Sequence, residues 1–177
     1  HLRASFEASC AVLRALDSYD CIGVFESPMP QRDAEGYRQL RAKIDKPIAA
    51  HYGSGCCHVR SDPTYDRGVS ALDQIGRGLC DSFVLGGGDV RSILDHAAVA
   101  QEAKKPFWIQ TVGTGLRAAW VVQLASVCQQ AVLSNLAAHN IWAQDLVKMP
   151  APVAGFAQVP ERPGLGVDID EEAVAVL

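Results

Sequence analysis

A helix pattern followed by a short apolar run recurs five times along this chain, at intervals of about 25 residues. The apolar runs lie at residues 21–25, 47–50, 82–85, 106–109 and 131–133. None of them alternates polar and apolar side chains, so each must be buried on both faces if it forms a strand. A parallel sheet covered by helices provides that environment. The repeat therefore predicts an α/β fold.

The helices expected between these runs follow from apolar side chains spaced three and four residues apart. They lie at residues 6–18, 34–44, 65–77, 90–104 and 116–129, with Asp33 placed to cap the second. After Leu146, prolines and glycines punctuate an ordered excursion, and a short helix is expected within residues 168–177. A chain of 177 residues has enough apolar surface for the core of one domain.

The charge pattern excludes two classes of partner. The formal net charge is -4, and the 16 basic residues are dispersed among 20 acidic ones, so no basic patch marks a nucleic-acid or anionic lipid surface. No apolar run reaches the ~20 residues that span a bilayer, and the first residues lack the apolar centre of a signal peptide. These features predict a cytoplasmic protein that binds neither nucleic acid nor membrane.

The six cysteines are too few for a disulfide scaffold, and most are expected to pack as reduced thiols. One cluster, formed by His51, Cys56, Cys57 and His58, contains zinc-ligand residue types. Its adjacent cysteines do not match the spaced pairs of structural zinc sites, so a loop with incidental thiols is the preferred interpretation. The chain begins with His1 and not with Met, which favours its being part of a longer protein.

Ligands of parallel α/β sheets bind beyond the carboxyl ends of the strands. Glu26 ends the first apolar run, where a carboxylate must be paired, protonated or bound to a cation. His51 ends the second run and either transfers protons, binds a metal or simply makes a hydrogen bond. Tyr52 either orients a substrate oxygen or covers the interior with its ring.

Two glycine-rich turns, at residues 86–88 and 111–115, follow the third and fourth runs. Such turns let the backbone approach a ligand and present helix N–H groups to an anion, although they also serve as plain tight turns. Neither matches a nucleotide-binding fingerprint. Asn135, His139 and Asn140 follow the last run as candidate substrate contacts or loop hydrogen bonds.

The order of these segments resembles a known family. The strings VFESPMP at 24–30, KPIA at 46–49, KPFWIQ at 105–110 with GTG at 113–115, and PERPGLGVD at 160–168 are similar to the catalytic barrel of the enolase superfamily, mandelate racemase/muconate lactonizing branch. The resemblance implies a partial TIM-like (β/α)7β barrel, with residues 1–177 holding strands four to eight and their helices. The capping domain and the first barrel strands would lie outside this chain. An independent doubly wound sheet is the structural alternative.

The resemblance also implies a set of site residues. Members of that family bind Mg²⁺ through carboxylates ending the third, fourth and fifth strands. Glu26 falls on the fourth-strand ligand, Tyr52 stands at the fifth, and the third lies before His1. The acid/base positions of the sixth and seventh strands align with Gly86 and Gln110. Most of the usual catalytic groups are thus replaced.

The resulting expectation is a divergent mandelate racemase-like enzyme. It would act on a hydroxy- or sugar-acid by α-proton abstraction, as a lyase (dehydratase) or an isomerase (racemase or epimerase). The catalytic residues expected are His51 and Gln110, with Glu26 as a Mg²⁺ ligand. The residues expected to bind the carboxylate substrate are Tyr52, Gly113, Thr114, Gly115, Asn135, His139 and Asn140. The alternatives are a non-catalytic relative that binds small acids and an inactive fragment. The full-length protein is expected to be a homo-oligomer.

Overall fold

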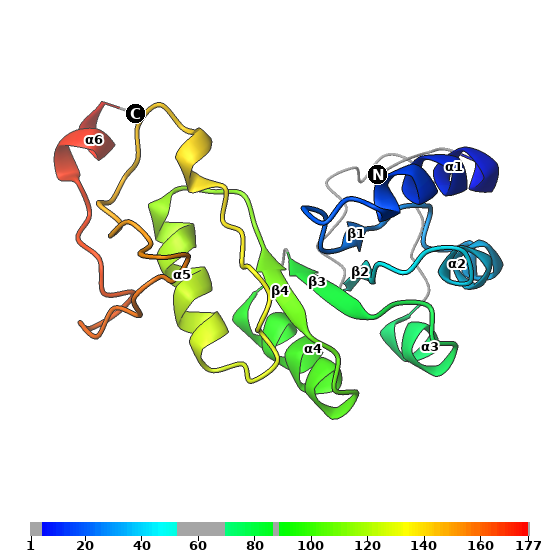
Figure 1. Ribbon diagram of the computed structural model, residues 1–177. Coiled ribbons are helices and arrows are strands. Elements are labelled where there is room, and N and C mark those ends of the chain that lie inside the picture. Colours follow the sequence, from blue (N-terminus) through cyan, green and yellow to red (C-terminus); the bar gives the residue numbers. More distant parts are fainter. Residues whose placement is uncertain (1–4, 53–69, 87–88, 177) are drawn as a thin grey trace. The chain divides into compact units, whose positions relative to one another are not determined.

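The computed structural model describes residues 5–52, 70–86 and 89–176. The chain divides into two compact units, residues 1–107 and 108–177, which are described separately below. Figure 1 labels the helices and strands of both. In the described ranges, no helix has both the length and the apolar character needed to cross a membrane.

Four strands form one sheet in the order β1-β2-β3-β4. They are β1 (Phe25–Glu26), β2 (Ile48–Tyr52), β3 (Ser82–Gly86) and β4 (Phe107–Gln110). β1 pairs with β2 in parallel, and β2 pairs with β3 in parallel. In β2 and β3 the apolar residues are buried and only the carboxyl ends are partly exposed, as their apolar composition requires. The predicted α/β class with a parallel sheet is confirmed.

The helices of the first unit begin at residues that cap them. They are α1 (Phe6–Asp17), α2 (Ala34–Arg41), α3 (Ala71–Gly76) and α4 (Val90–Glu102). Their N-cap side chains each accept a hydrogen bond from a backbone N–H of the first turn, and these caps are Ser5, Asp33, Ser70 and Asp89. The cap predicted at Asp33 is confirmed. The predicted helix at 65–77 is confirmed from residue 71 onward, since residues 65–69 lie outside the described range.

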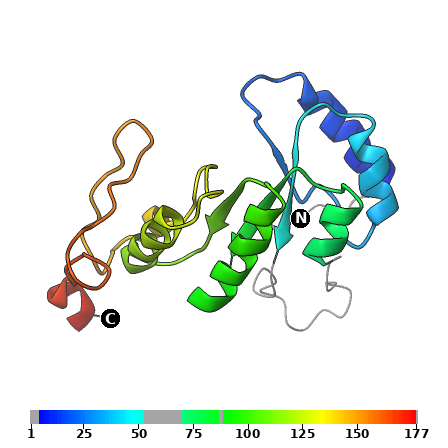
Figure 2. The ribbon, with the colours of Figure 1, turned by 90° about the horizontal axis from the view of Figure 1, so that it is seen from below.

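The core of the first unit joins α1 and α2 to the start of the sheet. Figure 2 shows these two helices side by side. Their buried side chains pack with those of the strands and of the β1–α2 connection, and the cluster comprises Cys10, Leu13, Phe25, Met29, Tyr37, Leu40, Ile44, Ile48 and Leu79. The hydroxyl of buried Tyr37 donates to the Met29 carbonyl at 2.8 Å, which fixes the segment that follows β1. This packing holds the carboxyl end of β1 in place.

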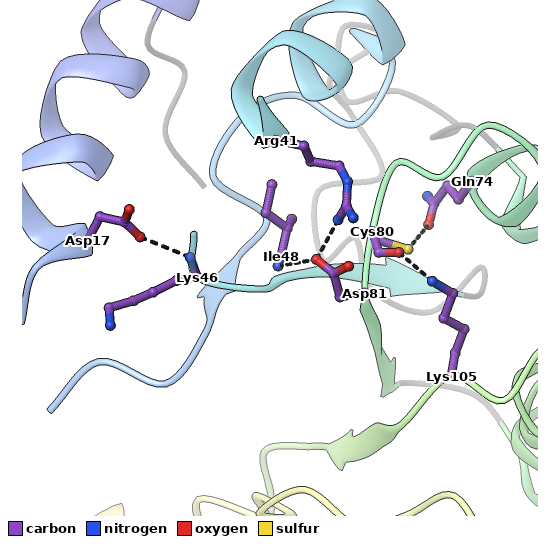
Figure 3. A network of polar contacts seen from close by, with 8 residues as sticks. All are labelled: Asp17, Arg41, Lys46, Ile48, Gln74, Cys80, Asp81 and Lys105. Atoms are coloured by element: carbon purple, nitrogen blue, oxygen red, sulfur yellow. Dashed lines mark hydrogen bonds and ion pairs between the residues drawn. The ribbon is translucent and has the colours of Figure 1, made fainter. Parts of the chain in front are cut away.

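A polar network supports the amino ends of β2 and β3 (Figure 3). The carboxylate of Asp81 accepts hydrogen bonds from the backbone N–H of Ile48 at 2.9 Å and from the Arg41 guanidinium. Its own backbone N–H donates to the Ile48 carbonyl at 2.8 Å. Nearby, the Lys105 ammonium donates to the Cys80 carbonyl at 2.9 Å. These contacts lie at the opposite strand ends from Glu26 and His51. They therefore hold the sheet together and are separate from the strand ends that carry those two residues.

The second unit contains α5 (Gly115–Ser126), the short 3-10 helix η1 (His139–Ile141) and α6 (Glu171–Ala175). Leu136 forms an isolated parallel bridge with Gln110 at the end of β4. The excursion after Leu146 is ordered, as predicted, and carries an antiparallel bridge between Val147 and Ile169. The short helix expected within 168–177 is confirmed as α6.

Two predicted strands differ from the structure. The run at 21–25 contributes only its last residue to β1, because Cys21 and Gly23 are exposed and the strand has one pairing partner, β2. The run at 131–133 is not a strand, and Val132 is 68% exposed. The pairing with β4 occurs three residues later, at Leu136, so within the described part of the chain four strands and a bridge replace the five expected strands.

Candidate functional site

The strand register brings Glu26 and His51 to one face of the sheet. Glu26 lies opposite Ala49, and His51 is two residues further along β2. Side chains alternate along a strand, so positions 49 and 51 share a face and the side chain of Glu26 shares it with them. Both residues stand at the carboxyl ends of their strands, where parallel sheets bind ligands. Two of the residues predicted from sequence are therefore neighbours.

The two side chains form a close pair. His51 Nε2 lies 3.2 Å from Glu26 Oε1. The imidazole is the more buried partner, with 11% of its side chain exposed, whereas 38% of the Glu26 side chain is exposed. A molecule arriving at this strand end therefore reaches the carboxylate before the ring.

Burial lowers the pKa of His51 below its ordinary value of 6.5, and the Glu26 carboxylate opposes this by favouring the protonated form. The net lowering favours a neutral imidazole at neutral pH. A neutral imidazole offers one N–H donor and one acceptor nitrogen. The pair can thus share or move a proton.

Ser27 contacts the other side of the ring. Its Oγ lies 2.7 Å from His51 Nδ1, and the residue is 3% exposed. Ser27 directly follows Glu26 and would ordinarily point to the opposite face of the sheet. Its φ of 41° lies in the left-handed region, which departs from strand geometry, and its hydroxyl reaches His51. Both nitrogens of His51 therefore have a partner.

Gln31 holds the backbone of His51. Its Nε2 donates to the His51 carbonyl at 2.9 Å, and its Oε1 accepts from the His51 N–H at 3.1 Å. The amide thus pairs with His51 much as a neighbouring strand would. Ser27 Oγ lies 3.2 Å from the same Oε1. Ser27, Gln31 and His51 form one hydrogen-bonded group behind Glu26.

Tyr52 lies on the opposite face, contrary to its predicted place in the site. It pairs with Leu85, and its ring contacts the rings of Phe83 and His96 with centroids 5.3 and 4.2 Å apart. His96 belongs to α4, so the phenol points toward the helices. Burial raises the pKa of Tyr52, which keeps it a neutral phenol. Alternation along β2 separates it from Glu26.

Magnesium does not fit the described residues of this face. Mg²⁺ prefers near-octahedral oxygen ligands. Glu26 supplies one carboxylate, its neighbour His51 supplies nitrogen, and Tyr52, at the expected fifth-strand position, points to the other face. Across residues 5–52, 70–86 and 89–176, no group of three or more His, Cys, Asp or Glu side chains could hold a metal ion. No chemical step is therefore assigned to a metal.

Gly86 ends β3 two residues after Val84, the partner of His51, so it lies on the face of His51 and contributes no side chain. The other members of the predicted His51 cluster, Cys56, Cys57 and His58, lie outside the described residues, as do Gly87 and Gly88.

In the second unit, Gln110 Oε1 accepts a hydrogen bond from Trp108 Nε1 at 2.9 Å. Asn135 Oδ1 accepts from the Ile109 N–H at 2.8 Å, so this side chain holds the backbone of β4. His139 is half-buried and Asn140 is exposed, both within η1. Their predicted catalytic and substrate-binding roles stay predictions.

The turn before α5 is covered by the chain's own carboxylate. The N–H of Gly115 donates to both oxygens of Asp145, at 2.7 and 2.9 Å, and the Gly113 carbonyl accepts from Trp142 Nε1 at 2.9 Å. Thr114, the N-cap residue, makes no side-chain cap. The N–H of Gly115 predicted to receive a substrate carboxylate thus binds Asp145 in this structure.

Ser27 and Gln31 were not predicted from the sequence. Their only signal is proximity to Glu26, since Ser27 follows it directly and Gln31 ends the proline-containing segment after it. Serine rarely adopts the left-handed region, so the sequence gives no reason to expect that conformation at Ser27.

Comparison with known proteins gives a consistent set of similarities. A family profile described as "Enolase C-terminal domain-like" matches residues 82–173. No curated protein matches the chain at a significant level. Solved structures match its fold over almost the whole length.

Three of these structures illustrate the range. A muconate cycloisomerase from Azorhizobium caulinodans has a TM-score of 0.74 at 21% identity, covering 98% of this chain and 47% of that chain. A dipeptide epimerase from Cytophaga hutchinsonii, in complex with Mg and the dipeptide D-Ala-L-Val, has a TM-score of 0.78 at 20% identity, covering 98% and 46%. An enolase from Mycobacterium smegmatis, in complex with tartrate, has a TM-score of 0.71 at 22% identity, covering 98% and 40%.

The chain thus spans about half the length of the structures it matches, and its parallel strands correspond to about half of their barrel domain. The family profile covers slightly more than half of the chain. This chain accordingly belongs to the enolase C-terminal domain-like family, within the mandelate racemase/muconate lactonizing branch of the enolase superfamily.

Proposed function

We propose that this chain is the C-terminal part of a barrel enzyme that acts on a small hydroxy- or sugar-acid by proton transfer at the carbon next to the carboxylate. The observation that carries the proposal is the pairing of Glu26 with His51 at the carboxyl ends of neighbouring parallel strands, 3.2 Å apart. A carboxylate and an imidazole in contact are the usual components of general acid–base catalysis.

The different exposure of the two side chains supports a different role for each. Glu26 is the more exposed and meets the substrate, so its carboxylate takes the α-proton. The electron pair of the broken C–H bond then moves into the substrate carboxylate, giving an enediolate. The Nε2–H of His51 donates a hydrogen bond to the Glu26 carboxylate and so orients the base.

Two outcomes are available to the enediolate. Protonation of the opposite face of the carbon by a water molecule gives the epimer, and the proton held by Glu26 then passes to the hydroxide that is left; this is an isomerase reaction. Cleavage of the C–O bond on the next carbon, as the C=C bond forms, releases hydroxide, which takes the proton held by Glu26 and leaves as water; this is a lyase reaction. The matched structures support a small acid as substrate, since one of them holds tartrate, a hydroxy acid, and another holds a dipeptide.

The test uses the full-length protein in D₂O with a panel of hydroxy acids and acid sugars. We expect the ¹H NMR signal of the α-proton to disappear for at least one substrate as deuterium replaces it. Stabilisation of the protein by these acids without exchange would identify a binding protein and contradict the proposal. Absence of both effects across the panel would also contradict it.

A further inference from the structure

We infer that Ser27 and Gln31 are positioning residues that fix the orientation and tautomer of His51, so that its Nε2–H faces Glu26. This inference concerns the same pair of side chains as the proposed function and rests on it for its effect on rate. The contacts that carry it lie within the first unit and are independent of any substrate.

The tautomer follows from which atoms can donate. An ionised carboxylate only accepts hydrogen bonds, so the contact between Glu26 Oε1 and His51 Nε2 requires the ring hydrogen to be on Nε2. Nδ1 of the neutral ring is then an acceptor. Ser27 Oγ, 2.7 Å away, must supply the hydrogen.

The serine hydroxyl has two acceptors within reach. Its single hydrogen can go to His51 Nδ1 at 2.7 Å or to Gln31 Oε1 at 3.2 Å. The shorter contact is with the ring, and Gln31 Oε1 already accepts the His51 N–H. The hydroxyl therefore serves the imidazole, and Gln31 serves the backbone that carries it.

The backbone of Ser27 supports a role beyond packing. Its φ of 41° is unfavourable for any residue with a Cβ, and such conformations persist where surrounding contacts determine them. Here the N–H of Ser27 still donates to the Ala49 carbonyl at 2.9 Å, continuing the ladder to β2. With this left-handed backbone, the Ser27 hydroxyl contacts the His51 ring and the Ser27 N–H keeps its hydrogen bond to β2.

Gln31 contributes a second fixed point. Its amide makes two hydrogen bonds to the backbone of His51, at 2.9 and 3.1 Å, so the end of β2 is held on the side from which Ser27 approaches. With the backbone held by Gln31 and Nδ1 held by Ser27, rotation of the ring is restricted. Nε2 then stays directed at Glu26.

The experiment is histidine-selective ¹⁵N NMR of the full-length protein at pH 8.5, where the neutral ring is observed directly. His51→Gln identifies the resonances of His51. We expect the wild type to show a protonated Nε2, with a ¹⁵N shift at Nδ1 typical of an accepted hydrogen bond. Ser27→Ala and Ser27→Gly should both move the Nδ1 resonance toward the value of an unbonded imidazole nitrogen.

The two serine variants separate the hydroxyl from the backbone. Both remove the hydroxyl, whereas only glycine relieves the left-handed φ. Ala138→Gly relieves a similar φ of 48° in the second unit and should leave the His51 resonances unchanged. Gln31→Ala should broaden or shift the ¹⁵N resonances of His51, because it removes both hydrogen bonds to the His51 backbone.

A protonated Nδ1 in the wild type would overturn the inference, as would Nδ1 resonances unaffected by both serine variants. Because the readout is spectroscopic, it holds whether or not α-proton exchange is found. Where exchange is found, Ser27→Gly should lower kcat at least about tenfold with little change in KM, since the substrate contacts Glu26 and not the serine.

Discussion

Replacement of Asp81 should destabilise the first unit more than replacement of its ion-pair partner. In Asp81→Ala the backbone N–H of Ile48 loses its acceptor, and Ile48 is fully buried at 0% exposure. The Arg41 guanidinium loses its carboxylate in the same variant. Arg41→Met removes only the ion pair, and Asp81→Asn keeps an oxygen for the Ile48 N–H.

The structure sets the size of each effect. A buried donor left without an acceptor costs about 1–3 kcal/mol. The ion pair is partly exposed, with 31% of the Arg41 and 34% of the Asp81 side chain accessible, so it adds up to about 1 kcal/mol. We therefore expect Asp81→Ala to lower the free energy of unfolding by about 1–4 kcal/mol, and Arg41→Met and Asp81→Asn by up to about 1 kcal/mol each.

Urea unfolding measures the total effect, and native-state hydrogen exchange at the Ile48 amide measures the local one. Exchange at Ile48 should accelerate strongly in Asp81→Ala and little in Arg41→Met. The reasoning is refuted if Asp81→Ala changes the free energy of unfolding by less than about 0.5 kcal/mol, or if Arg41→Met costs more than Asp81→Ala.

Three further predictions concern the site and the second unit. Burial lowers the pKa of His51 below 6.5, so the unfolded chain binds more protons than the folded chain as the pH falls below that value. The free energy of unfolding should therefore decrease as the pH falls through this range. Unfolding curves recorded across pH should show a smaller decrease for His51→Gln. An alanine Cβ at Gly115 would lie 2.5 Å from Val147 Cγ2, so Gly115→Ala should cost about 1–3 kcal/mol in thermal unfolding, while Gly76→Ala, with open space around it, should be neutral or stabilising. In calorimetry with Mg²⁺, Glu26→Gln should leave any binding unchanged, and a large loss of affinity would restore the predicted metal role.

The fold was predictable where burial and periodicity agree. Residues 48–50 and 83–85 are all apolar and lie buried inside the sheet, so their sequences indicate their environment directly. The run at 131–133 has the same composition, but Val132 is exposed and no strand forms. A three-residue run carries too little information to fix a pairing partner, and the backbone instead pairs at Leu136.

The site was predictable at the level of strand ends. Glu26 and His51 were found because polar residues end apolar runs in a parallel sheet, and the register confirms that they share a face. Tyr52 points to the opposite face because adjacent strand residues alternate, so the structure does not bring it together with Glu26, and its substrate-binding role stays a prediction. The contacts of Ser27 and Gln31 depend on one backbone angle and on tertiary pairing, which no local pattern encodes.

The turn at 113–115 shows a further limit of sequence reasoning. Glycines before a helix predict N–H groups that can bind an anion, and the N–H of Gly115 does bind a carboxylate. Its acceptor is Asp145, about 30 residues away in the chain, and nothing in the local sequence identifies it.

The most direct test of the account is the rate at which Glu26→Gln exchanges the substrate α-proton with D₂O, measured beside Glu35→Gln, whose carboxylate pairs with Arg38 on the exposed side of α2. The proposed role of Glu26 predicts a fall of about 10²–10⁴-fold in kcat for Glu26→Gln and no change for Glu35→Gln. A Glu26→Gln rate within about threefold of the wild type would show that the base lies elsewhere and would contradict the account.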